Sequence, residues 1–366
     1  MRSRPPRRSR AWRRCRCWRT RKWSTPRSRR RWRRACSSNG ACSTACSVLP
    51  TRRRAWPPSS RSVPATGRGS NMARVGFIGL GNMGGGMAAN LAKAGHDVRA
   101  FDLSADALER AKAAGCLPVE SAAAAAEGAE AVITMLPAGK HVEQVYEDSV
   151  FGAADTGAIL IDCSTIDVAT ARRVADAAQA KGLAAVDAPV SGGIAAAAGG
   201  TLTFMVGGDA AAFERAEVFL SAMGKAVIHA GGNGAGQASK ICNNMLLGAT
   251  MVATCEALLL AQKLGLDPQT FYDIASVSSG ACWSLNTYAP LPGMGPQTPA
   301  DNGYQGGFAA GLMLKDLKLA MEAAESTHSE TPMGARAAEL YTKFADAGNA
   351  GVDFSGIIKM LGAGKV

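Results

Sequence analysis

Short apolar runs alternate with stretches of helical spacing through residues 74–236. The first apolar run, at 75–78, leads into a segment in which Met87 and Leu91 repeat at the spacing of a helix face. Further strands are expected at 98–101, 131–136, 158–162, 184–187, 202–206 and 226–229, with helices at 105–114, 169–180 and 210–223. This alternation predicts an α/β fold with a mostly parallel, doubly wound sheet of Rossmann type.

The strand pattern stops at about Gly236, and helical spacing continues to the end of the chain. One Pro- and Gly-rich segment, 290–311, interrupts it. We therefore expect an α/β domain over 72–235 and an all-α domain over 236–366, linked by a long interdomain helix at about 237–264. The apolar stretch 245–264 contains threonines, a glutamate and a glutamine, which favours a buried helix over a membrane span.

A glycine triplet follows the first predicted strand. Gly79 permits the tight turn from strand to helix, Gly81 lets the backbone approach a pyrophosphate, and Gly84 lets the helix pack closely on the strand. This spacing, between a strand and a helix, is typical of a dinucleotide-binding site. The candidate cofactor-binding residues here are Gly79, Leu80, Gly81, Asn82, Met83 and Gly84.

Asp102 ends the second predicted strand, where a carboxylate can accept hydrogen bonds from the hydroxyl groups of the adenine ribose. NAD is favoured over NADP, because a carboxylate repels a 2′-phosphate and the neighbouring Leu103 and Ser104 supply no cation. The alternative is a solvated aspartate at a strand end.

Two more strand ends carry small or polar residues, namely Leu136-Pro137 and Cys163-Ser164-Thr165. Open parallel sheets bind ligands beyond the carboxyl ends of their strands, so both loops are expected to face the cofactor. They could equally be ordinary turns.

A serine and two glycines, Ser191, Gly192 and Gly193, follow the strand predicted at 184–187. Consecutive glycines expose backbone N–H groups that can hold a carboxylate. A nucleophilic serine is the rival interpretation, but the G-x-S-x-G pattern is absent from the sequence.

Lys240, Asn243 and Asn244 stand at i, i+3 and i+4 near the start of the long helix, so they are predicted to share one face. A lysine near the positive end of a helix has its charged form disfavoured, which suits proton transfer. The alternatives are a solvated lysine here and an exposed first turn for Lys315-Asp316. No metal site is expected, because the four histidines show no ligand spacing.

The first 71 residues differ sharply from the rest. They hold 22 of the 41 basic residues and no acidic one, so residues 72–366 carry 19 basic and 29 acidic side chains. We expect disorder over 1–71, which lack apolar periodicity. Three origins compete: an upstream stretch before a true start at Met72, a mitochondrial transit peptide, or a basic nucleic-acid-binding arm. The five cysteines after Met72 are scattered, which is typical of a reducing compartment.

Four motifs in order, GFIGLGNMG, DAPVSGG with GTLTFMVGG, GAGQASKICNN and a late KDL, resemble the β-hydroxyacid dehydrogenase family over essentially all of 72–366. Within that family the segment 282–308 looks most like the 3-hydroxyisobutyrate dehydrogenases. The resemblance implies NAD-dependent oxidation of 3-hydroxyisobutyrate to methylmalonate semialdehyde, a step of valine catabolism. The alternatives are another short β-hydroxyacid dehydrogenase or semialdehyde reductase, acting on serine, tartronate semialdehyde or 4-hydroxybutyrate, and, more remotely, nucleic-acid binding through the basic arm.

The resemblance also implies residue roles. Lys240 matches the catalytic lysine; Asn243, Asn244 and Asp316 would contact substrate, with Ser191, Gly192 and Gly193 at its carboxylate; Leu136, Pro137, Thr165 and Lys315 would contact the cofactor. One departure is His141, where related enzymes often carry Asn near the nicotinamide. The resemblance further implies a homodimer or homotetramer. We expect a cytoplasmic enzyme, or a mitochondrial matrix enzyme if the basic head is a transit peptide, with no membrane partner.

Overall fold

The computed structural model describes residues 72–364. The predictions made for residues 1–71, including disorder and the competing origins of that segment, lie outside the described residues.

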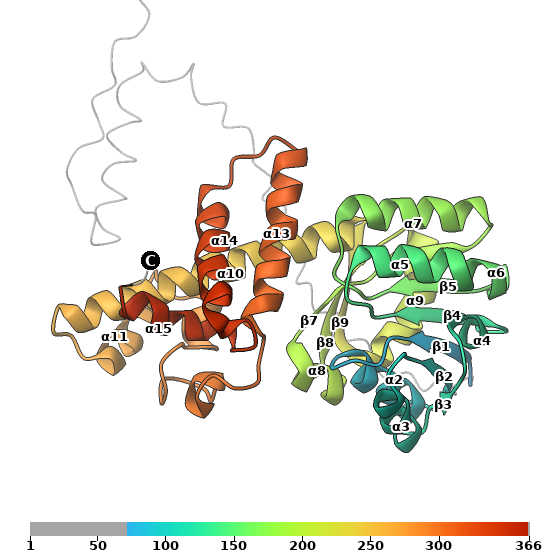
Figure 1. The fold of residues 1–366 in the computed structure, drawn as a ribbon, viewed down its shortest axis with the longest axis horizontal. Coiled ribbons are helices and arrows are strands. Elements are labelled where there is room, and N and C mark those ends of the chain that lie inside the picture. Colours follow the sequence, from blue (N-terminus) through green and yellow to red (C-terminus); the bar gives the residue numbers. More distant parts are fainter. Residues whose placement is uncertain (1–71, 365–366) are drawn as a thin grey trace, which may run out of the picture. The chain divides into compact units, whose positions relative to one another are not determined.

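One mixed sheet forms the centre of the α/β part (Figure 1). Its strands are β1 (Arg74–Ile78), β2 (Asp97–Phe101), β3 (Leu117–Pro118), β4 (Ala131–Thr134), β5 (Ile159–Asp162), β6 (Ala184–Asp187), β7 (Val190–Ser191), β8 (Leu202–Gly207) and β9 (Gly224–Gly231). The order is β3-β2-β1-β4-β5-β6-β8-β7, with β9 on β8. The strands from β3 to β6 in this order are parallel, whereas β8 runs antiparallel to β6. The strand order reverses direction at β1, which makes the space between the ends of β1 and β4 the expected ligand site.

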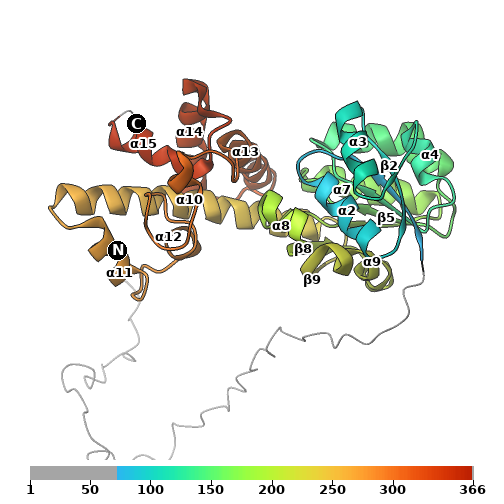
Figure 2. The same cartoon turned by 90° about the horizontal axis from the view of Figure 1, so that it is seen from below.

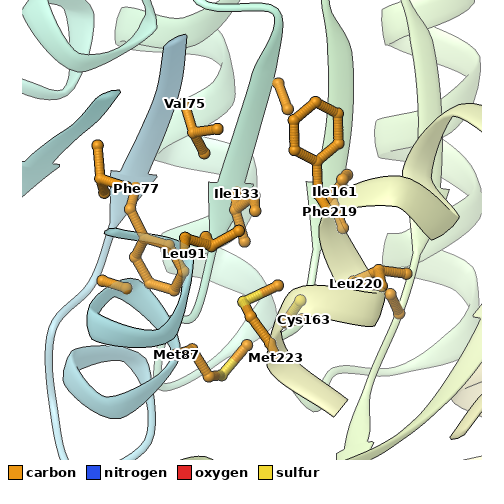
Figure 3. Packing of buried hydrophobic residues seen from close by; sticks show 14 of the residues in the cluster. Val75, Phe77, Met87, Leu91, Ile133, Ile161, Cys163, Phe219, Leu220 and Met223 are labelled. Carbon is orange, nitrogen blue, oxygen red and sulfur yellow. The ribbon is translucent and has the colours of Figure 1, made fainter. Parts of the chain in front are cut away.

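Helices cover both faces of this sheet (Figure 1). One layer comprises α2 (Gly84–Lys93), α3 (Ala105–Ala113) and α9 (Ala210–Met223), and the other α4 (Ala122–Ala126), α5 (Gly139–Val145) and α7 (Val168–Ala180). Successive residues of β1 pack on opposite faces of the sheet: Phe77 packs with the first helix layer and Ile78 with the second. Figure 3 shows Phe77, Leu91 and Met223 meeting in the first of these cores. Burial on both faces explains why β1, β4 and β5 are nearly continuous apolar runs.

The rest of the described chain after β9 is helical, as predicted. It comprises α10 (Ala235–Lys263), α11 (Pro268–Ala275), α12 (Trp283–Asn286), η2 (Pro299–Asn302), α13 (Ala310–Ser326), α14 (Pro332–Phe344), η3 (Ala345–Asn349), η4 (Phe354–Gly356) and α15 (Ile357–Gly362). Figures 1 and 2 show α10 running from the sheet into this helical part, where it packs against α13, α14 and α15. Met251, Leu317 and Tyr341 are central to their shared core.

The helix α10 is long and apolar enough to cross a membrane, by length and composition alone. Its residues Lys240, Asn244 and Cys255 are nevertheless buried, and it packs against both the sheet and the other helices. We therefore interpret α10 as an interior helix, in agreement with its broken apolar run.

Several short elements were not predicted. The strands β3 and β7 have two residues each, too few to show a period. The segments α6 (Phe151–Ala153), α8 (Gly193–Gly199) and η1 (Tyr146–Val150) are also short, and α4 consists of alanines, which carry no polar alternation. The strand predicted at 131–136 ends at Thr134 instead, because Met135 and Leu136 already belong to the turn into α5.

Candidate active site

The glycine triplet forms the turn between β1 and α2. Gly79 has a φ of +97°, which side chains other than glycine rarely adopt, and its N–H donates to Phe101 O at 2.9 Å. A Cβ on Gly84 would overlap the carbonyl oxygen of Gly79, whereas a Cβ on Gly81 would meet no atom within 4 Å. The close packing at Gly84 and the open space at Gly81 fit a turn that receives a pyrophosphate at a helix N-terminus.

Asp102 lies immediately after β2 and is fixed by two backbone donors. Its Oδ2 accepts from Leu80 N at 2.6 Å and its Oδ1 from Ser104 N at 2.8 Å. The carboxylate is half-buried, while Leu103 beside it is 96% exposed. This arrangement joins the acid directly to the glycine turn, so that both could hold one dinucleotide.

Hydrogen bonds among buried side chains join the loops that follow β4 and β5. Asp162 Oδ1 accepts from Thr134 Oγ1 at 2.8 Å and from Ser164 Oγ at 2.6 Å, and Ser164 Oγ accepts from Leu136 N at 2.8 Å. Burial raises the pKa of Asp162, and the hydrogen bonds from Ser164 and Thr134 oppose that shift. Asp162 is not among the predicted site residues, although an acid at the end of a fully buried strand is a signal that could have identified it.

Lys315, in α13, connects the same two loops to the helical part. Its Nζ donates to Pro137 O and to Thr165 O, both at 2.7 Å. Burial lowers the pKa of this lysine, and the carboxylates of Asp316 and Asp162 oppose the shift. Lys315 is therefore not the exposed first-turn residue of the alternative interpretation.

A lysine, an amide and a carboxylate meet between α10 and α13. Lys240 is 8% exposed, Asn244 2% and Asp316 5%. Asn244 Nδ2 donates to Asp316 Oδ2 at 2.5 Å. Among the described residues, Lys240 Nζ makes no hydrogen bond or ion pair. It does not appear among the unpaired polar atoms that are fully buried, so the nitrogen keeps a small solvent exposure. Its amine therefore has no protein partner among the described residues.

Burial lowers the pKa of Lys240, and the positive charge of Lys315 lowers it further, while the Asp316 carboxylate opposes both effects. From the sequence, a lowered pKa is expected for Lys240 because of the helix N-terminus. Lys240 lies beyond the first turn of α10, where that effect has faded, so burial is the main cause. An uncharged amine in this position can accept a proton.

The predicted face of Lys240, Asn243 and Asn244 is only partly buried. Asn243 is exposed, and its Nδ2 donates to Asn244 Oδ1 at 2.9 Å, so it supports Asn244 from the solvent side. Its predicted contact with substrate stays a prediction.

Ser191, Gly192 and Gly193 form the turn between β7 and α8. Gly192 has a φ of +137° and Gly193 of +73°, and a Cβ on Gly193 would meet nothing within 4 Å. No hydrogen bond among the described residues joins this turn to Lys240. The open backbone is compatible with a bound carboxylate, and that role stays a prediction.

His141 lies in α5, beside the loop that contains Pro137. Its Nδ1 is buried and has no hydrogen-bond partner among residues 72–364. The predicted place of His141 near the nicotinamide stays a prediction.

The doubly wound sheet, the glycine turn and Asp102 place the protein in the dinucleotide-binding class. Two family models match the chain: the NAD binding domain of 6-phosphogluconate dehydrogenase over residues 74–232, and the NAD-binding domain of NADP-dependent 3-hydroxyisobutyrate dehydrogenase over residues 234–361.

Three relatives illustrate the similarity. The chain is 52% identical to 3-hydroxyisobutyrate dehydrogenase of Pseudomonas aeruginosa, over 79% of this chain and 98% of that protein. It is 47% identical to NAD-dependent L-serine dehydrogenase of the same organism, over 79% and 98%. The solved structure of Mycobacterium tuberculosis 3-hydroxyisobutyrate dehydrogenase with L-serine matches with a TM-score of 0.77 and 46% identity, over 79% of this chain and 99% of that one. The chain belongs to the β-hydroxyacid dehydrogenase family, whose members most like it are the 3-hydroxyisobutyrate dehydrogenases.

Proposed function

We propose that this enzyme oxidises 3-hydroxyisobutyrate to methylmalonate semialdehyde, a step of valine catabolism, with Lys240 as the general base. The observation that carries the proposal is the buried, unpaired amine of Lys240 beside Asn244 and Asp316. Bound NAD⁺ supplies the acceptor for the hydride that leaves the alcohol carbon. The substrate thereby loses one hydride and one proton, and its primary alcohol becomes an aldehyde.

The proton is the part of the reaction that the protein handles. The neutral amine of Lys240 takes the hydroxyl proton as the hydride leaves, and the resulting ammonium is stabilised by the carboxylate of Asp316. Asn244 holds that carboxylate in place through its 2.5 Å hydrogen bond. In the reverse direction the Lys240 ammonium returns the proton to the aldehyde oxygen.

The other predicted residues bind and orient. Lys315 holds Pro137 and Thr165 together and so shapes the wall at which the nicotinamide would lie. Ser191, Gly192 and Gly193 offer backbone donors for the substrate carboxylate. Gly79 to Gly84, Asp102 and Leu136 are assigned to the cofactor.

L-Serine is a second candidate substrate, supported by the similarity to an L-serine dehydrogenase and to a solved structure that contains L-serine. Both substrates carry a carboxylate and a hydroxymethyl group on the same carbon. They differ in the third substituent, which is a methyl group in 3-hydroxyisobutyrate and an ammonium group in L-serine. The groups around that carbon, rather than the base, must set the preference.

We also propose that the enzyme forms a homodimer or homotetramer and acts in the cytoplasm. The mitochondrial matrix remains the alternative, supported by eukaryotic relatives whose names include "mitochondrial".

The test is a panel of short hydroxyacids, each assayed with NAD⁺ and with NADP⁺. The panel comprises 3-hydroxyisobutyrate, L-serine, 4-hydroxybutyrate and glycerate, which is the reduced form of tartronate semialdehyde. The proposal predicts the highest kcat/KM for 3-hydroxyisobutyrate with NAD⁺. A kcat/KM for L-serine that exceeds it would transfer the assignment to the second candidate. Turnover of neither compound would overturn both.

A further inference from the structure

The first turn of α10 contains a buried amide that the proposed reaction does not use. Gln237 is fully buried; its Nε2 donates to Ser164 O at 2.7 Å, and its Oε1 accepts from Ile166 N at 3.1 Å. Ser164 and Ile166 flank Thr165, a predicted cofactor contact. One side chain therefore holds the loop after β5 on both sides of that contact.

The same helical turn is also anchored to the sheet. Asp187, at the end of β6, accepts from Gly234 N at 2.7 Å through Oδ1 and from Gln237 N at 2.8 Å through Oδ2. A Cβ on Gly236 would overlap the carbonyl oxygen of Met205, so the helix start lies directly on β8. The start of α10 therefore cannot slide or rotate without breaking these contacts.

Lys240 follows Gln237 by three residues and lies about one turn further along the same helix. Gln237 is hydrogen-bonded to the loop 163–166, and Lys240, one turn later, carries the unpaired amine. Transfer of a proton and a hydride requires reacting atoms at about 3–3.5 Å, and a displacement of about 1 Å can cost about 10²-fold in rate. The rigid connection therefore bears directly on the chemistry.

We propose that Gln237 is a positioning residue that sets the separation between the loop 163–166 and the amine of Lys240. It touches neither substrate nor reacting atoms in this scheme, and it acts through the two backbone groups that it holds. The inference rests on the proposed function, because it needs Lys240 to be the base.

The first test replaces Gln237 with leucine, which has a similar size and no hydrogen-bonding group. We expect kcat to fall by at least about tenfold, and by a larger factor than the Kd for NADH rises, because the glycine turn and Asp102 still hold the other half of the cofactor. Gln262→Leu is the matched control, since Gln262 is exposed near the end of the same helix. A folded Gln237→Leu enzyme with the kcat of the wild type would overturn the proposal.

The second test, Gln237→Glu, gives a readout that a merely structural role would not move, and it also serves if the leucine variant fails to fold. A protonated glutamic acid can donate to Ser164 O and accept from Ile166 N as glutamine does, whereas a carboxylate repels Ser164 O. The titratable and charged groups on the elements packed around this turn include Asp162, Cys163, Arg172, Asp187, Lys240 and Lys315. We expect the ratio of variant kcat to wild-type kcat to fall as pH rises, and a ratio independent of pH would contradict the proposal.

Lys240→Ala, assayed alongside, separates two kinds of failure. If Lys240→Ala turns over like the wild type, the proposed function fails. If Lys240→Ala is inactive while both Gln237 variants behave like the wild type, only the positioning role of Gln237 fails.

Discussion

The two ends of the site are built in different ways. The end assigned to the adenosine half of NAD is one contiguous turn, Gly79 to Gly84, with Asp102 at the next strand end, and it relies on backbone groups and open space. The reaction end combines Lys240, Asn244 and Lys315-Asp316 from two helices with the two loops of the sheet, and its charges are largely buried. Under the proposed assignment, Lys240 is separate from the glycine turn and Asp102, so we expect proton transfer to be removable without loss of cofactor binding.

The largest effect is expected at Lys240. Lys240→Ala should lower kcat by about 10²- to 10⁴-fold, the usual worth of general acid/base catalysis. Lys240→Arg should be similarly impaired, because a guanidinium stays protonated and cannot accept the proton. Steady-state assays with 3-hydroxyisobutyrate measure both variants, and Lys263→Ala, at the exposed far end of α10, is the matched control. A Lys240→Arg variant with wild-type kcat would rule out a neutral amine as the base.

A smaller effect is expected at Asp316. Loss of a hydrogen-bonded charge beside the base should lower kcat/KM by about tenfold in Asp316→Asn, consistent with about 1.5 kcal/mol for such an interaction. The same substitution removes the charge that raises the pKa of Lys240, so that this pKa should fall further below its usual value.

A pH profile measures this directly. For oxidation, kcat/KM should rise with pH as Lys240 loses its proton, and should level off below pH 10.5, the ordinary value for lysine, because burial lowers the pKa. For reduction of the aldehyde the dependence should be reversed, since the protonated amine is then the active form. Asp316→Asn should move the pH profiles of both oxidation and reduction to lower pH. A shift to higher pH would contradict the inference that the negative charge of Asp316 raises the pKa of Lys240.

The smallest effect on turnover is expected at Asp102. Asp102→Ala should reduce the preference for NAD over NADP by about tenfold, because the variant lacks the like charge that opposes a 2′-phosphate. The ratio of kcat/KM values for the two cofactors measures it, with Asp106→Ala, exposed in α3, as the control. If the ratio is unchanged, residues other than Asp102 distinguish NAD from NADP.

The same contrast explains what could be predicted from the sequence. The sheet and the glycine turn depend on neighbours in the chain, so periodicity and spacing revealed them. An acid at the end of a buried strand is a local signal for Asp162. Its bond to Thr134, and the bond of Gln237 to Ser164, join residues far apart in the sequence, which no local pattern shows. For Lys240 the direction of the pKa shift was predicted, but its cause, burial between α10 and α13, required the packed structure.

The separation of the two ends is tested most directly by titrating Lys240→Ala with NADH and following the quenching or enhancement of nicotinamide fluorescence. The account predicts a Kd within about twofold of the wild type in a variant that has lost nearly all turnover. A Kd that rises as steeply as kcat falls would show that cofactor binding and proton transfer share Lys240, and would contradict the account.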